Sequence, residues 1–403
     1  MVISTGKTNR IEVVDALRGF AIMAILLIHH VDHYFFPEFP ANSPHWLNFL
    51  DKATVRVVFG LFSGKTYAIF TMLFGFTFFI QHNNQKKKGK DFGYRFMWRM
   101  ILLAVFALIN AAFFPSGDIL MLFVCVSPIL FICRNWSDKA VLILIVLLML
   151  QPVEWVHFIL SRLNPSHQLP DFGALALHHQ VIENTKNGNF FDFIWINVTV
   201  GLKVSLLWVF ETGRFLQAAG LFLLGLYIGR KHYFVSSPGN FHFWKRVLII
   251  SIIFFVILYL IKKPILRTDG ITRQTIGLAI DLWQKLVFTF AIVASFVLVY
   301  QNNFIKKLFT PLRYYGKMSL TNYVTQSLFG ALIYFPIGLY LAPHCGRFLS
   351  LLIGLAVFTI QMIFSKLWLS KYNKGPFEEI WHKWTWIDFG KKRENDSDTS
   401  PKL

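Results

Sequence analysis

The sequence has few charged residues for its length. Only 15% of its 403 residues are Asp, Glu, Lys or Arg, whereas 55% are hydrophobic and the mean hydropathy is +0.50. Soluble globular domains carry roughly 25% charged residues. The composition therefore excludes an ordinary soluble protein and indicates a chain that is surrounded by the lipid bilayer.

Acidic residues, cysteines and nucleotide-binding motifs are also scarce. The 40 Lys and Arg residues outnumber the 21 Asp and Glu residues, and the basic residues gather at the ends of apolar runs. This position indicates that they anchor the cytoplasmic ends of membrane helices. It excludes nucleic acid as a partner. The three cysteines, Cys125, Cys133 and Cys345, lack the spacing of a metal site, so we expect no metal cofactor. The string GLFSGKT at 60–66 has too few residues between its glycines for a phosphate-binding loop.

Long apolar runs fill most of the chain. The first run is too long for a cleavable signal peptide and carries ionisable residues, so we expect it to remain as a helix. One bilayer crossing needs about 20 residues. The pattern therefore predicts an all-α, polytopic transmembrane helix bundle with spans near 14–36, 61–82, 97–114, 117–133, 139–158, 214–230, 246–262, 281–300, 317–341 and 348–370, about ten in all.

The distribution of basic residues indicates that an eleventh apolar segment, 191–212, does not cross the bilayer. Most basic clusters, among them 85–95, fall on the cytoplasmic side only if this segment lies at the outer surface or re-enters. Both termini are then cytoplasmic. The basic cluster at 262–273 falls outside and opposes this assignment. We expect a single transmembrane domain over 1–389 and a disordered cytoplasmic tail over 390–403.

The first apolar run carries a stripe of ionisable side chains. Arg18 and His29 are eleven residues apart, close to three helical turns, so they share one face about 16 Å apart along the axis. Asp15 and His33 join this stripe, and Asp32 lies at its edge. Such side chains are costly in lipid, so we expect them to face the protein interior or a wet cavity.

Two interpretations of this stripe remain open. His29 suits a general base because imidazole titrates near neutrality. Asp15 and Arg18 can equally form a structural pair near the headgroups. A metal site formed by His29, Asp32 and His33 is disfavoured, because one helix offers few ligands and no HExxH-like motif accompanies it.

Two further residues stand at the predicted outer ends of spans. Lys65 either lines the outer mouth of the second span or extends its ammonium to the interface. Asp118 follows Ser-Gly and is placed to cap the helix that it precedes, a role that can coexist with function.

Six segments of the sequence form a pattern that extends along nearly the whole chain. They are RIEVVDALRGFAIMAILLIHH (10–30), GKTYAIFTMLFGFTF (64–78), SGDILMLFVCVSPIL (116–130), GRFLQAAGLFLLGLYIGRK (213–231), YGKMSLTNYVTQSL (315–328) and NKGPFEEIWHKWTW (373–386). These segments resemble those of YeiB-like bacterial membrane proteins, whose shared region is known only as a domain of unknown function. The resemblance implies a multi-pass protein of the bacterial inner membrane.

The N-terminal part, about 10–135, is also similar to membrane acyltransferases, whereas about 213–389 resembles the family's C-terminal part. In acyltransferases that modify cell-surface sugars, an Arg is followed ten residues later by a His, a pattern that Arg18 and His29 resemble. This likeness implies transfer of an acyl group from a cytoplasmic acyl-CoA-type donor to an envelope glycan or small-molecule acceptor.

The likeness also implies roles for individual residues. His29 would be the base or proton relay, and Asp32 or His33 would orient it. Asn110 and Lys65 would stabilise the oxyanion. We expect the substrate-binding residues to be Arg18, Asp15, Asp118, Arg214, Asn322 and Gln326.

This chain departs from its family at two positions. Many YeiB-like members carry Asn at the position of His29 and His at the position of Asn110. Each residue lies eleven positions after a cytoplasmic arginine, Arg18 or Arg99, so we predict that they face each other at equal depth. The exchange also fits a site that has lost its activity.

Two other functions stay open beside acyl transfer. A transporter could use the stripe on the first helix as a proton or substrate pathway, and a non-catalytic scaffold could use it for packing. The sequence contains no recognisable inverted repeat, which weighs against a transporter.

Overall fold

The computed structural model describes residues 11–268 and 270–387, which form helices and turns and include no β-strand. The predicted all-α class is confirmed, while the predicted tail at 390–403 lies outside the described residues. The helices are α1 (Glu12–Val31), η1 (His33–Phe35), α2 (His45–Phe62), α3 (Lys65–Lys86), α4 (Gly93–Phe113), α5 (Leu120–Val126), α6 (Pro128–Cys133), α7 (Asp138–Met149), α8 (Pro152–Leu163), α9 (Ala174–Asn187), α10 (Phe190–Ile196), the π-helical η2 (Asn197–Gly201), α11 (Leu202–Glu211), α12 (Arg214–Arg230), α13 (Pro238–Ile265), α14 (Ile271–Val299), α15 (Asn303–Leu308), α16 (Thr310–Lys317), α17 (Ser319–Tyr334), η3 (Ala342–His344), α18 (Arg347–Lys371) and α19 (Pro376–Thr385).

Among the described residues, seven helices are long and apolar enough to cross a bilayer, or eight if the bent pair α7 and α8 forms one span. Three of the ten predicted spans correspond to shorter helices. The span predicted at 117–133 is replaced by α5 and α6, which together cover only Leu120–Cys133. The helices α12 and α17 contain 17 and 16 residues.

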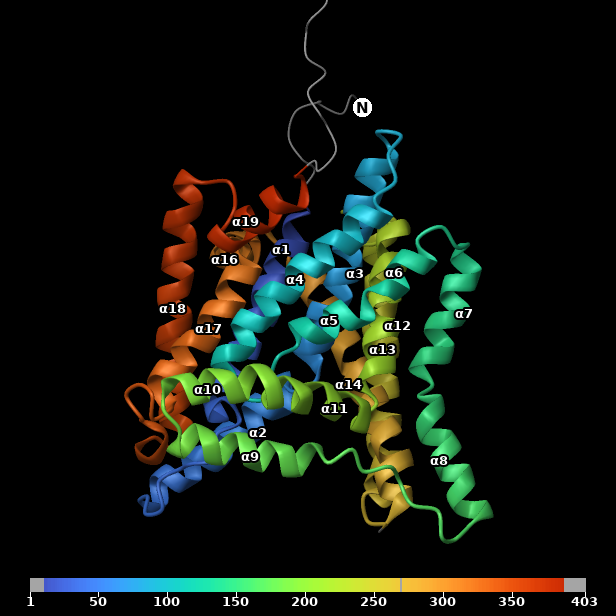
Figure 1. Cartoon of the computed structure of the whole chain (residues 1–403). Coiled ribbons are helices and arrows are strands. Elements are labelled where there is room, and N and C mark those ends of the chain that lie inside the picture. The colour runs from blue at the N-terminus through green and yellow to red at the C-terminus, as the bar shows by residue number, and fades with distance from the viewer. Residues whose placement is uncertain (1–10, 269, 388–403) are drawn as a thin grey trace, which may run out of the picture.

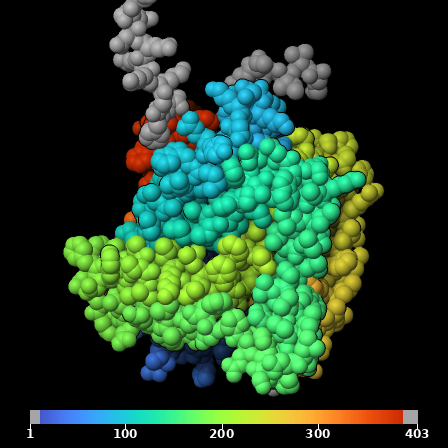
Figure 2. Space-filling model, turned by 45° about the vertical axis from the view of Figure 1, so that its right-hand side comes forward, coloured from blue at the N-terminus to red at the C-terminus, as the bar shows by residue number. Residues whose placement is uncertain are grey.

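The segment predicted not to cross the bilayer has an unusual direction. By length and hydropathy, Phe190–Glu211 qualifies as a span. In Figure 1, however, α9, α10 and α11 run across the view below α4 and α5, whereas α7, α12 and α18 run along it. Figure 2 shows the same three helices as a green belt across the molecule. That this segment does not cross stays a prediction, and its crosswise direction favours it.

Glycines allow the central helices to touch backbone to backbone. A Cβ atom at Gly225 of α12 would lie 1.9 Å from the carbonyl oxygen of Met72 of α3, and one at Gly75 would lie 2.0 Å from that of Phe222. Helices in a bilayer associate through such close packing, because the lipid tails are as apolar as the side chains. The α3–α12 pair therefore forms the centre of the bundle.

The outer helices have the surface expected of a membrane protein. Only 6% of the apolar window of α13 is buried, and its exposed residues include Ile249, Ile253 and Leu260. An exposed apolar surface of this length is unfavourable in water and favourable in lipid. The chain is thus a multi-pass membrane protein that contacts the bilayer.

The end of the bundle at the top of Figure 1 carries several basic groups, and we call it the basic end. It holds the loop 86–93 together with Arg134, Arg230 and Arg313. These arginines pair with acidic residues from other elements, and Arg230 Nη1 lies 3.1 Å from Asp138 Oδ1. The positive-inside rule predicts that this end is cytoplasmic. We call the opposite end the far end.

Candidate functional site

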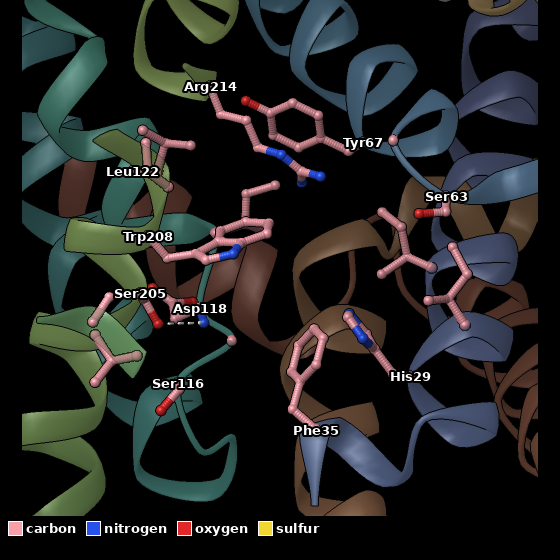
Figure 3. Close-up of a pocket in the computed structure, with 18 of the residues that line it drawn as sticks. His29, Phe35, Ser63, Tyr67, Ser116, Asp118, Leu122, Ser205, Trp208 and Arg214 are labelled. Atoms are coloured by element: carbon pink, nitrogen blue, oxygen red, sulfur yellow. Dashed lines mark hydrogen bonds between the residues drawn. The ribbon is translucent and has the colours of Figure 1, made fainter. Parts of the chain in front are cut away.

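A cavity of about 400 Å³ lies in the far half of the bundle. Its walls come from α1, the turn between α2 and α3, the segment 116–119 and α12, and the crosswise helices α9 and α11 close one side. Figure 3 shows His29 on one wall and Asp118, Ser205 and Trp208 on the opposite wall. We call this space the histidine cavity.

His29 faces the histidine cavity from the last turn of α1. Its Nδ1 atom is buried and has no hydrogen-bond partner among the described residues. The ring packs against aromatic rings, with its centroid 4.7 Å from that of Phe114 and 5.9 Å from that of Phe35. The ring lines the cavity, which places the imidazole to take a proton from a bound molecule.

Strained backbone borders the same cavity. His33, Tyr34 and Phe35 have φ angles of 46°, 56° and 68°, and Ser116 has a φ of 58°. Residues with side chains rarely adopt this left-handed region, and such strain concentrates at functional sites. Phe35 and Ser116 both line the cavity, so the strain places side chains on its walls.

Asp118 anchors the wall opposite His29. Its carboxylate accepts hydrogen bonds from the backbone N–H groups of Leu120 and Met121, at 3.2 and 2.7 Å, and from Asn110 Nδ2 at 2.8 Å. The predicted role of Asp118 in capping the following helix is confirmed. Asn110 in turn accepts a hydrogen bond of 2.7 Å from the Ser327 hydroxyl, so the network joins α4, α5 and α17.

Replacement of Asn110 by alanine should lower the free energy of unfolding by about 1–3 kcal/mol, because it removes one hydrogen bond to the buried Asp118 carboxylate and leaves the Ser327 hydroxyl without its partner. Unfolding in mixed micelles that contain sodium dodecyl sulfate would measure this change. The exposed Asn303 supplies the matched control, and its replacement by alanine should change the stability by less than about 0.5 kcal/mol. Equal stability of the two variants would contradict the network.

Arg214 lines the histidine cavity from the first residue of α12, after Gly213 with a φ of 63°. Its guanidinium lies 4.2 Å from the ring centroid of Trp208 and 5.6 Å from that of Tyr67. Figure 3 shows the guanidinium pointing into the cavity. A cation held by aromatic faces in this way can still bind an anionic group of a ligand.

The prediction that His29 and Asn110 face each other is wrong. Asn110 lies behind Asp118, and both ends of its amide are bonded to Asp118 and Ser327. Equal depth in two helices sets the height of a side chain and leaves its direction around the axis undetermined. The residue that faces His29 across the cavity is Asp118.

Asp32 and His33 do not orient His29. Asp32 forms an ion pair of 2.9 Å with Arg347. His33 bonds to the backbone oxygen of Glu38 at 2.8 Å and to the Ser350 hydroxyl at 2.7 Å. Burial lowers the pKa of His33 to about 4, so its ring is neutral at physiological pH. Both residues attach the end of α1 to α18, because the left-handed turn directs them away from His29.

Lys65 also points away from His29. Its ammonium donates hydrogen bonds to the backbone oxygens of Gly60 and Phe59, at 2.7 and 3.4 Å, and it lines a different cavity. Its predicted part in stabilising an oxyanion beside His29 is therefore not supported by the geometry. The positive φ of Gly64 turns the chain at this point, so neighbouring residues face opposite sides.

Asn322 and Gln326 belong to α17, and their side chains are buried between helices rather than on a cavity wall. Asn322 Nδ2 donates to Ser365 Oγ and to the Tyr315 backbone oxygen, each at 3.0 Å. The amide of Gln326 is fully buried and has no partner among the described residues. Asn322 thus packs α17 against α18, and neither residue contacts the space beside His29.

A second cavity, of about 250 Å³, lies in the basic half of the bundle. Arg18 lines it and is held by Asp15 Oδ1 at 3.0 Å and by Thr77 Oγ1 at 2.9 Å. Three more cationic side chains reach this cavity, and the only carboxylate among its described lining residues is that of Glu378. The cations are Arg99, Lys317 and Lys374. We call this space the arginine cavity.

Tyr323 lines both the histidine cavity and the arginine cavity. The side chain is only 1% exposed and stacks on Phe70, with the ring centroids 6.2 Å apart. Phe70 also packs against Phe123. The two cavities therefore approach each other from opposite halves of the bundle and meet at an aromatic side chain.

Several residues that line the cavities were not predicted from the sequence. Ser205 and Trp208 belong to 191–212, which was expected to lie at the outer surface or to re-enter, without a part in a site. Tyr67 and Tyr323 lie within motifs that resemble the YeiB-like family, yet aromatic residues are common in membrane helices and carry no signal of their own. Ser116 had a weak signal, since Ser-Gly before Asp118 indicates a turn.

Within the described residues, no group of three or more His, Cys, Asp or Glu side chains is placed to hold a metal ion. The histidines at and just after the end of α1 separate in space, because His29 faces the cavity, His30 bonds to Tyr334 and His33 of η1 bonds to Ser350. The histidine cavity presents an imidazole, a carboxylate and a guanidinium group, those of His29, Asp118 and Arg214.

Comparison with known proteins places the chain among relatives that have no described activity. Residues 228–388 match the family model described as "Protein of unknown function (DUF418)". The chain is 25% identical to the uncharacterized protein YxaH of Bacillus subtilis (strain 168), over 96% of each chain. It is 23% identical to an uncharacterized 39.9 kDa protein of Bacillus acidopullulyticus, over 94% of each.

A shorter match is to a protein of Escherichia coli. Over 70 residues it is 33% identical to the uncharacterized protein YeiB of strain K12, which covers 17% of this chain and 18% of YeiB. No solved structure matches the chain. Together with the family model over residues 228–388 and the relative YxaH, this match makes the chain similar to YeiB-like proteins with a domain of unknown function.

Proposed function

We propose that this protein is an acyltransferase of the bacterial inner membrane that moves an acyl group from a coenzyme A thioester to a hydroxyl or amine of an envelope glycan or small molecule. The observation that carries the proposal is the pair of cavities on either side of Tyr323. One has a cationic lining suited to an anionic donor, and the other has an imidazole suited to deprotonating an acceptor.

The arginine cavity would hold the donor. It presents four cationic side chains and one carboxylate, and coenzyme A carries several phosphate charges that arginine and lysine bind well. This cavity lies at the basic end, which is expected to be cytoplasmic, where coenzyme A thioesters occur. The helix α1 carries Arg18 on this cavity and His29 on the other, so a donor with a long arm could extend along it.

The histidine cavity would hold the acceptor and the reacting atoms. The acceptor oxygen forms a bond to the thioester carbonyl carbon while the carbon–sulfur bond breaks. The hydroxyl proton passes to His29 and then to the leaving thiolate. Arg214 is the cation in this cavity that can stabilise the negative charge on the carbonyl oxygen, the role expected earlier for Lys65 and Asn110.

The proposal predicts that Arg18→Gln raises the KM for the acyl donor by about tenfold with a smaller change in kcat, because it removes a charge-assisted contact to a phosphate. Purified protein would be incubated with labelled acetyl-coenzyme A and envelope extract, and labelled acceptor and released thiol would be measured. Competition by coenzyme A gives a second readout of donor binding. Arg18→Lys should retain much of the affinity.

The matched control is Arg246→Gln, an exposed arginine at the same end of the bundle, which should leave the KM unchanged. An unaltered KM in Arg18→Gln would remove the donor site from this cavity. Transfer of label in detergent solution also separates acyl transfer from transport, because transport needs two compartments. No transfer to any acceptor, together with uptake of solute in proteoliposomes, would overturn the proposed function.

A further inference from the structure

A third cavity, of about 410 Å³, lies between the α2–α3 turn and the helices α13 and α14. Four lysines line it, and the only carboxylate among its described lining residues is Asp281. We call it the lysine cavity. Its lysines are Lys65, Lys262, Lys263 and Lys285.

Asp281 neutralises only part of this positive charge. One of its carboxylate oxygens binds Lys262 and the other binds Lys285, each at 2.5 Å. Lys262 also donates to Gln284 Oε1 at 3.0 Å. One carboxylate facing four ammonium groups leaves a clear excess of positive charge, and charges inside a membrane protein are costly unless they are paired or functional.

Asp281 pairs with neither Lys65 nor Lys263, and of these two lysines Lys65 is the buried one. It is only 8% exposed, and among the described residues its hydrogen bonds go to the backbone oxygens of Gly60 and Phe59. Its ammonium also lies 5.4 Å from the ring centroid of Phe288. Backbone oxygens and an aromatic face hold a cation in place while leaving its charge available to an anion.

Apart from Gln284, most of the remaining lining is apolar or aromatic, and the cavity borders the lipid-facing part of the bundle. Phe255 and Tyr259 come from α13, the helix whose apolar window is 6% buried, and Leu266 directly follows its last residue. A ligand that fits this lining has an anionic head beside the lysines and an apolar part along α13. The phosphate of an amphiphile has this chemistry.

We propose that the lysine cavity binds the phosphate group of an anionic amphiphile that reaches it from the bilayer. The site adjoins the histidine cavity, because Lys285 packs against Gly64, where a Cβ atom would lie 2.8 Å from its Cδ. Gly64 lines the histidine cavity and Gly60 lines the lysine cavity. The proposal concerns binding alone and does not depend on acyl transfer.

Binding would be measured by native mass spectrometry of the full chain, exchanged into nanodiscs of phosphatidylcholine with a small fraction of phosphatidylglycerol. Lys65→Gln and Lys262→Gln should each lower retention of phosphatidylglycerol by about tenfold, since each removes a charge-assisted contact. The matched control is Lys245→Gln, an exposed lysine near the other end of α13, which should retain the lipid as the unchanged chain does.

The variant Asp281→Asn distinguishes two interpretations of the lysine cavity, a binding site and an ion-pair cluster that serves only packing. The carboxylate competes with the ligand for Lys262 and Lys285, so its removal should increase phosphatidylglycerol retention several-fold even if it lowers the melting temperature. A cluster that serves only packing predicts lower stability and no increase in retention. Retention that falls or stays constant in Asp281→Asn would overturn the proposal.

Inorganic phosphate, tested in the same nanodiscs without phosphatidylglycerol, distinguishes free phosphate from a lipid headgroup as the source of the bound phosphate group. Protection of the unchanged chain against thermal unfolding, lost in Lys65→Gln, would assign the cavity to phosphate in general. Retention of the lipid without an effect of inorganic phosphate would assign it to lipid headgroups. Failure of both probes on the unchanged chain would contradict the proposal, whether or not the protein transfers acyl groups.

Discussion

Replacement of His29 by alanine is expected to lower kcat for acyl transfer by at least about a hundredfold, because general base catalysis contributes roughly 10²–10⁴-fold. The ring has no hydrogen-bond partner at Nδ1 in the described structure, so its loss breaks no polar contact there. The thermal stability should therefore fall only as far as lost packing against Phe35 and Phe114 requires. Transfer of label from acetyl-coenzyme A and the melting temperature measure the two effects separately.

His178 offers a control within the same cavity. It lies on α9, and its ring faces the cavity together with Ala174 and Leu175. Its replacement by alanine should change the KM for the acceptor more than kcat, because we assign it no proton transfer. Full activity of the His29 variant, or equal losses of kcat in the two variants, would remove His29 from the role of base.

Replacement of Gly225 by alanine is expected to prevent the bundle from folding correctly. The added methyl carbon would lie 1.9 Å from the backbone oxygen of Met72, and no side-chain rotation relieves a contact with backbone. The helices α3 and α12 must separate, and overpacking costs about 1–3 kcal/mol or more, with the upper end expected where the clash is with backbone. The fraction of monodisperse protein after extraction, measured by size-exclusion chromatography, should fall sharply.

The loss of folded protein in Gly225→Ala is a specific test, because the same substitution should have the opposite effect at a helical glycine without close contacts. Alanine normally stabilises a helix by about 1 kcal/mol relative to glycine. Gly239 is also helical, and nothing lies within 4 Å of the place where its Cβ atom would be. Gly239→Ala should therefore leave the yield of folded protein unchanged or raise it. Normal yields of the Gly225 variant would show that the close contact between α3 and α12 is not needed.

The features predicted from the sequence depend on one helix at a time. Hydropathy indicates the apolar helices, and spacing places Arg18 and His29 on faces of α1 that point into the protein. The capping position of Asp118 follows from the turn that precedes α5. Each of these inferences uses neighbouring residues and the fixed geometry of a helix.

The features that the sequence did not predict depend on how helices are rotated and where turns direct the chain. Asn110 bonds to Asp118 because α4 and α5 are joined by a short turn. Lys65 and Asp32 face away from His29 because left-handed residues follow or precede them. Composition gives no information on these rotations, and the family motifs mark positions without giving directions.

The contact of the two cavities at Tyr323 also has an electrical consequence. If both cavities fill with water, most of the membrane voltage falls across the thin aromatic layer between them. Moving one charge through 100 mV changes its energy by about 2.3 kcal/mol. A negatively charged group that passed Tyr323 would therefore sense the membrane potential directly, and this side chain must also prevent protons from leaking between the two faces.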